Sequence, residues 1–173
     1  MPIFFLRHHV QSPSPVTQVA VEVERIAPDL LGLTYRIGGD LRRVAFPKPQ
    51  ANARTNGLWQ HSCCEAFLGA GQGYYELNFS PSSQWAAYRF DGHRAGMRNA
   101  TMDDPAIAWT REGDAAKLVA TIRLPSDVKG PLGLSAIIED TSGNRSFWAL
   151  AHPPGEPDFH DAACFVAQLP PAD

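Results

Sequence analysis

Apolar and polar residues alternate with a period of two along most of the chain, and no other feature of the sequence constrains the possible fold as much. Residues 17–38 show the pattern clearly, with every second position apolar from Val19 to Val23 and again from Leu31 to Tyr35. Because successive side chains of a strand point to opposite faces, this alternation predicts two antiparallel strands, each with one buried face. A turn is expected at the proline and aspartate between them.

Strand-like runs of this kind continue to the end of the chain, interrupted by two irregular segments at residues 41–57 and 91–105. Three runs lie between Leu58 and Phe90, and further runs follow at 107–111, 116–124, 132–140, 145–151 and 164–169. The total of about ten to twelve short strands, with no convincing amphipathic helix, is typical of an all-β protein. We therefore expect an antiparallel, jelly-roll-like β-sandwich with little helix.

Composition limits the domain organisation and the partners. The chain has 173 residues, of which 44% are hydrophobic and 19% charged, which suits one domain over residues 1–173. The net charge of -3 comes without a long run of either sign, so no nucleic-acid partner is expected. The apolar run Ile3–Leu6 is too short for a signal-peptide core or a membrane span, so we expect no membrane partner and a cytoplasmic location.

The three cysteines are predicted to be buried thiols. Cys63, Cys64 and Cys164 cannot form a disulfide framework, and their spacing matches no zinc motif. Free cysteine commonly behaves as a small apolar residue in protein cores.

The central runs carry polar and aromatic side chains on the strand face that points away from the core. Strand phase places Glu65 opposite its apolar neighbours, and the same reasoning assigns Asn78, Arg89 and Trp148 to that outward face, with Trp59 delivered by the preceding loop. Indole rings can stack on the C–H faces of a small polyhydroxy ligand, while the carboxylate, amide and guanidinium bind its hydroxyls. The alternative is a solvated face on which Glu65 and Arg89 simply pair.

Several short motifs resemble those of the DOMON-like, family 9 carbohydrate-binding modules. They occur in the family's order and span about Leu41 to Leu169 on a loose motif reading. The motifs are Trp59–Leu68, Tyr74–Pro81, Ile122–Pro125, Phe147–Trp148 and Pro157–His160.

The resemblance implies a β-sandwich that binds sugars without catalysing a reaction, often at a chain end clamped between two tryptophans. By motif, Trp59 resembles the first clamp residue, Glu65 the hydroxyl-binding glutamate and Trp148 the second clamp residue. Arg89 and Asn144 match less closely, because the loops between the motifs vary in length. Where the family usually has acidic residues before the glutamate, this chain has His-Ser-Cys-Cys, which weakens an inherited calcium site.

Haem is an alternative ligand, because the wider DOMON superfamily includes sandwiches whose iron is held by Met with His or Lys. His93 and Met97 lie four residues apart in the second irregular segment, with Met102 nearby. A Met-His pair would suit an electron-transfer haem. Packing of both methionines against the core is the other interpretation.

Two further alternatives involve metal or catalysis. The loop from His152 to His160 contains two His and nearby acidic residues that could ligate a metal, although its three prolines indicate a stiff turn. His152 could also line the pocket after Trp148. A thiol nucleophile beside His61, or Glu65 and Glu76 as a glycosidase pair, would make the protein an enzyme. We expect instead a non-catalytic domain without a resident cofactor that binds a saccharide-like small molecule.

Overall fold

The first sheet of the sandwich has five antiparallel strands. The computed structural model describes residues 1–172. In spatial order, this sheet consists of β1 (Ile3–Phe5), β3 (Val16–Ala27), β4 (Leu30–Gly39), β10 (Ala115–Arg123) and β9 (Ala106–Glu112). Its apolar side chains point to one face and its polar side chains to solvent, as the alternation in sequence predicts. The predicted hairpin between β9 and β10 is confirmed, with Gly113 at φ +59° in the turn.

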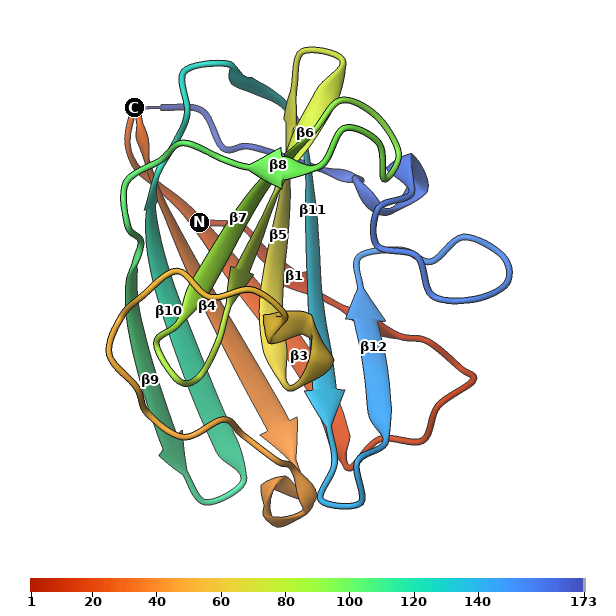
Figure 1. The fold of residues 1–173 in the computed structure, drawn as a ribbon. Coiled ribbons are helices and arrows are strands. Elements are labelled where there is room, and N and C mark those ends of the chain that lie inside the picture. The colour runs from red at the N-terminus through yellow and green to blue at the C-terminus, as the bar shows by residue number, and fades with distance from the viewer. Residues whose placement is uncertain (173) are drawn as a thin grey trace.

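The second sheet has eight strands and packs face to face with the first (Figure 1). Its strands in spatial order are β2 (Arg7–His8), β12 (Arg145–Ala149), β11 (Val128–Glu139), β5 (Cys63–Ala70), β6 (Gly73–Phe79), β7 (Trp85–Phe90) and β8 (Arg98–Asn99), and β13 (Ala167–Gln168) pairs with β11.

Helical structure in residues 1–172 is limited to three short 3-10 turns: η1 (Leu41–Arg43), η2 (Leu58–Gln60) and η3 (Ala162–Cys164). The prediction of an antiparallel β-sandwich with little helix is therefore confirmed. The thirteen strands slightly exceed the predicted number, because β2, β8 and β13 are only two residues long. None of the helical turns in residues 1–172 is long and apolar enough to cross a membrane.

The main core lies between the sheets and contains the inward side chains of both. A buried hydrogen bond crosses it: the Tyr35 hydroxyl of β4 donates to the backbone carbonyl of Glu65 in β5, at 2.6 Å. This bond satisfies a hydroxyl that would otherwise be costly to bury. It also ties the first sheet to the strand that carries a predicted site residue.

A second, smaller cluster lies on the other face of the second sheet. It includes Phe67 of β5, Tyr88 and Phe90 of β7, and Phe159 from the loop after β12. In Figure 1, η2 lies over β5, and the loop that follows β12 extends beside the sheet. The central strands of the second sheet are thus covered on both faces, and the outer face carries the candidate site.

Candidate ligand-binding site

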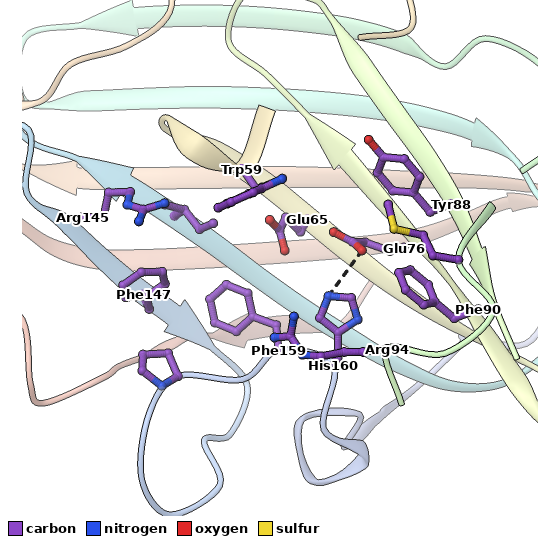
Figure 2. A pocket seen from close by; sticks show the side chains of 13 residues that line it. Trp59, Glu65, Glu76, Tyr88, Phe90, Arg94, Arg145, Phe147, Phe159 and His160 are labelled. Atoms are coloured by element: carbon purple, nitrogen blue, oxygen red, sulfur yellow. Dashed lines mark ion pairs between the residues drawn. The ribbon is translucent and has the colours of Figure 1, made fainter. Parts of the chain in front are cut away.

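A cavity of about 550 Å³ opens on the outer face of the second sheet. This volume lies within the range of small-ligand sites in proteins. Its lining combines aromatic rings with two acids, two arginines and a histidine (Figure 2). The lining residues are Trp59, Glu65, Glu76, Tyr88, Phe90, Arg94, Met97, Ile137, Arg145, Phe147, Pro157, Phe159 and His160.

Trp59 and Phe147 form one end of the cavity together with Arg145 (Figure 2). Gly57 adopts φ +78° just before η2, a left-handed conformation that glycine tolerates, and the turn that follows presents Trp59 with 45% of its surface exposed. The Arg145 guanidinium lies 5.8 Å from the Trp59 ring centroid and 5.9 Å from that of Phe147. A partly exposed indole beside a second ring is a suitable stacking surface.

Tyr88 and Phe90 lie at the opposite end of the cavity (Figure 2). The Tyr88 hydroxyl donates to Asn56 Oδ1 at 2.8 Å, and the Phe90 ring stacks on Tyr74 with 5.0 Å between centroids. These contacts hold both rings in place, so that aromatic surface is present at both ends of the cavity.

Glu65 and Glu76 lie between the two aromatic ends (Figure 2). They occupy diagonal positions of paired strands, because Glu65 is opposite Asn78 and Glu76 is opposite Phe67. Glu65 is 2% exposed and Glu76 is 6% exposed. The Ser135 hydroxyl donates to Glu65 at 3.3 Å, and the Cys63 thiol makes a longer contact with it at 3.9 Å.

Burial raises the pKa of both acids. Desolvation raises the pKa of Glu76 to about 7, against an opposing effect of the nearby Asn78 amide and Arg94. Desolvation also raises the pKa of Glu65 well above its usual value, and the negative charge of Glu76 raises it further. Two buried carboxyl groups that repel each other do not both ionise readily, so the pair retains a proton near neutral pH.

His160 is held beside Glu76 by a chain of hydrogen bonds. The backbone N–H of Arg94 donates to the Tyr74 hydroxyl at 3.1 Å, and the Tyr74 hydroxyl lies 2.7 Å from His160 Nδ1. Desolvation, with the nearby Arg94 charge, lowers the pKa of His160 to about 4, so the imidazole is neutral at pH 7. A neutral imidazole has one N–H, so one ring nitrogen donates and the other accepts. Nδ1 pairs with the Tyr74 hydroxyl, and Nε2 lies 3.4 Å from Glu76 Oε2 (Figure 2).

Asp158 organises the loop that carries His160. Its carboxylate accepts from His93 at 2.7 Å, from Arg94 at 2.9 Å and from the His160 backbone N–H at 3.1 Å. Burial raises the pKa of Asp158, but the hydrogen bonds from His93 and Arg94 outweigh that effect and leave the pKa lower than usual. The positive charge of Arg94 is thus matched by a carboxylate outside the cavity lining.

Trp59 and Glu65 line the cavity, whereas the face predicted for Trp148 is wrong. Trp148 is 4% exposed and belongs to the main core, where its indole N–H donates to Ser146 Oγ at 3.1 Å and its ring stacks on His8. Its neighbour Phe147 faces the cavity instead. Both faces of β12 are covered, so apolarity alone could not indicate which aromatic residue faces the main core.

The face predicted for Arg89 is also wrong. Arg89 lies on the side of β7 that carries the core residues Trp85 and Ala87. Its guanidinium donates to the Ala70 carbonyl at 2.9 Å and lies 5.0 Å from the Tyr75 ring centroid. It closes the end of the sandwich and is absent from the cavity lining.

The other predicted site residues lie outside the cavity lining. Asn78 is fully buried on the cavity side of β6, and neither amide atom completes a hydrogen bond of regular geometry. Asn144 donates to Asp140 in the turn between β11 and β12. His152 Nε2 lies 2.8 Å from the Arg7 carbonyl, and its ring packs against Phe159.

The alternative ligand sites are not assembled in the described chain. Met97 lines the cavity, but its predicted haem partner His93 is held by Asp158 outside the lining. Across residues 1–172, no group of three or more His, Cys, Asp or Glu side chains is placed to hold a metal ion. The three cysteines are free and buried, as predicted, and burial raises the pKa of the Cys63 and Cys64 thiols, which disfavours a thiolate nucleophile.

Sequence reasoning missed most of the cavity lining. Strand phase predicts that Phe147 and Tyr88 face the core, which is wrong for both. Arg94, Phe159 and His160 lie in loops, where no periodicity indicates direction, and no motif singles out Arg145. The density of aromatic and charged residues in the segment Pro157–Asp161 was the only available signal for the loop residues.

Comparisons with known proteins agree with the sandwich architecture. No protein-family model matches the chain, and no curated protein matches its sequence. A proposed carbohydrate-binding protein from Bacteroides uniformis ATCC 8492 superposes with a TM-score of 0.65 at 13% identity, over 95% of this chain and 84% of that one. A family 9 carbohydrate-binding module from Caldicellulosiruptor kristjanssonii, solved with cellotriose, gives 0.54 at 11% identity, over 89% and 74%. The predicted resemblance to family 9 modules is confirmed at the level of the fold.

Proposed function

We propose that this protein is a non-catalytic saccharide-binding domain and that its ligand occupies the cavity on the outer face of the second sheet. The observation that carries the proposal is the combination, in one cavity, of aromatic rings at both ends and buried carboxyl groups between them. Sugars present apolar C–H faces and polar hydroxyl edges, and this lining offers a partner for each.

Each group in the cavity has a role that suits a polyhydroxy ligand. Trp59 and Phe147 would stack against a sugar ring. Glu65 and Glu76 would accept hydrogen bonds from its hydroxyls, and Arg145 would donate to its oxygens. The fold supports this assignment, since the two solved structures compared above are described as carbohydrate-binding.

Titration of the purified protein with a panel of sugars, followed by tryptophan fluorescence and calorimetry, tests the proposal. Trp59→Ala should weaken binding by about tenfold or more, because stacking and the burial of its exposed indole are lost. Trp109→Phe is the matched control, because Trp109 packs against Phe46 outside the cavity lining. Absence of binding to every sugar, or undiminished binding in Trp59→Ala, contradicts the proposal.

A screen with chromogenic glycosides addresses the enzymatic alternative for the same cavity. Within residues 1–172, Glu65 and Glu76 are the only acids in the cavity lining, so a glycosidase working here would depend on them. We expect no turnover. Hydrolysis by the wild-type protein that disappears in Glu76→Gln would instead identify a catalytic site.

A further inference from the structure

The Glu65 and Glu76 carboxyl groups have no cationic partner in the described chain. Across residues 1–172, no Lys or Arg nitrogen forms an ion pair with either group within 4.0 Å. The nearest ring nitrogen, His160 Nε2 at 3.4 Å from Glu76, belongs to an imidazole that is neutral at pH 7. The contacts to Glu65 come from a hydroxyl and a thiol, which carry no charge.

Buried acids without a counter-charge cost folding free energy, and proteins normally pair such groups or avoid them. The fully buried amide of Asn78 lies directly across from Glu65 and completes no hydrogen bond of regular geometry. The protein therefore has unused acceptor capacity at the floor of an accessible cavity and, when one of the two acids is ionised, a negative charge without a counter-ion there.

The surrounding walls are suited to a cation. The side chains of Trp59, Tyr88, Phe147 and Phe159 line the same cavity, and aromatic rings attract ammonium groups through the negative quadrupole of their faces. An ammonium has three donors and no acceptor, which complements carboxylate oxygens with unused lone pairs. Neutral hydroxyls would satisfy the hydrogen bonds of this floor but would leave its charge uncompensated.

We infer that the saccharide bound in this cavity is an amino sugar, whose protonated amine lies against the Glu65 and Glu76 carboxyl groups while its ring contacts the aromatic walls. The inference rests on the proposed function and specifies its ligand class. The wall at Trp59 would hold any sugar, and the acidic floor would select the amine.

The other charged groups at the cavity are compatible with this selection. Arg94 faces the acids from the loop after β7, but its charge is matched by Asp158. Arg145 lies at the far end, against the Trp59 and Phe147 rings. Ionisation of Glu76, whose pKa is about 7, strengthens the attraction for an amine, so the preference should fall as the pH drops below that value.

The test compares glucosamine, glucose and N-acetylglucosamine by calorimetry on the full chain at pH 7. Acetylation removes the charge of the amine, and glucose replaces it with a hydroxyl. We expect glucosamine to bind roughly tenfold more tightly than either neutral sugar, in line with the strength of a charge-assisted hydrogen bond. Glu76→Gln and, independently, Glu65→Gln should reduce this preference for glucosamine over glucose to about threefold or less. Glu112→Gln, an exposed change in β9 of the other sheet, should retain it.

The possible outcomes separate the two proposals. Equal binding of glucose and glucosamine by the wild-type protein overturns the inference and leaves saccharide binding intact. If cyclohexylamine, which has no hydroxyls, binds as tightly as glucosamine while no neutral sugar binds, the cavity is an amine site and the saccharide proposal fails. If no sugar binds at all, both proposals fail. Because the ligands are compared on the wild-type protein, this series tests the preference for an amine even if a glutamate variant does not fold.

Discussion

Strands β10 and β5 belong to opposite sheets, and their burial differs in a way that locates the site. β10 is exposed or half-buried at every second position, whereas β5 is buried at all eight of its positions. The outer face of the first sheet meets solvent, while the outer face of the second sheet is covered by η2 and the loops after β7 and β12. An antiparallel sheet needs only one buried face to form a core, and its other face can remain in solvent. The covered outer face of the second sheet is therefore the place to look for a functional site.

The two faces of β5 also differ in chemistry. Its inner side chains, such as Leu68, join the main core. Its outer face presents Glu65 and Phe67 to the smaller cluster and the cavity. The inner face is therefore apolar throughout, whereas the outer face buries an acid without a counter-charge. Such a local departure from good packing is common at functional sites.

The largest expected effect is the difference in unfolding free energy between losing a tryptophan from the core face and losing one from the cavity. Trp148→Ala removes a buried indole from the main core and should lower the free energy of unfolding by about 3–5 kcal/mol. Trp59→Ala removes an indole that is 45% exposed and should cost about 1 kcal/mol or less. Urea denaturation measures both values. Equal losses for the two variants would remove the distinction between a core face and a ligand face.

The next effect concerns the pH dependence of stability. The folded-state pKa of Glu76, about 7, lies above its usual value of 4.5, so the folded protein retains a proton that the unfolded chain releases between these values. The carboxyl group therefore destabilises the protein progressively as the pH rises from about 4.5 to 7. Relative to the wild type, Glu76→Gln should gain about 3 kcal/mol of stability between pH 4 and pH 8.

Denaturation curves at several pH values measure this difference, with Glu112→Gln as an exposed control. Parallel stability profiles for the wild type and Glu76→Gln would show that Glu76 titrates normally. Glu65 would then be the one acid of this pair on the outer face with a raised pKa.

A smaller effect tests the hydrogen bonds that hold His160. Tyr74→Phe removes the hydroxyl that accepts from the Arg94 backbone N–H and shares a hydrogen bond with His160 Nδ1, and should cost about 1–2 kcal/mol because two partners lose a bond. Tyr75→Phe is the matched control on the other face of β6, where the hydroxyl donates to the exposed Asp127. Urea denaturation should show a larger loss for Tyr74→Phe, and the reverse order would contradict the assignment of the network.

The smallest effect is expected at the rim of the cavity. Arg145 forms no ion pair within residues 1–172. Its guanidinium lies near the Trp59 and Phe147 rings. Arg145→Ala should change the free energy of unfolding by about 0.5 kcal/mol or less. A loss above about 2 kcal/mol, the range of a buried network, would make this residue part of the fold.

Much of the fold could be predicted from the alternation in sequence. Residues 17–38 form the antiparallel pair β3 and β4, and residues 107–124 contain the β9 and β10 hairpin. Glu65 lies on the opposite side of β5 from Leu68, as strand phase requires. These predictions succeeded because a strand's side chains alternate regardless of what covers either face.

The same reasoning failed where both faces of a strand are covered. In β12 and β7, the inner and outer positions carry residues of similar apolarity, such as Trp148 beside Phe147 and Ala87 beside Tyr88. Alternation then shows that two faces exist but cannot indicate which one meets the other sheet. The prediction that Arg89 and Trp148 lie on the outer face is wrong for this reason.

The sequence by itself determined the strands, their antiparallel pairing through short turns, and the acid at position 65 opposite a core leucine, because these follow from local periodicity. Only the tertiary structure decided that Phe147 rather than Trp148 faces the cavity, and that Arg94 and His160 reach it from loops far apart in sequence. Those positions depend on which elements cover the second sheet and on the ion pair between Arg94 and Asp158 that joins the two loops. Both are contacts between residues far apart in the sequence, which no local pattern of residues specifies.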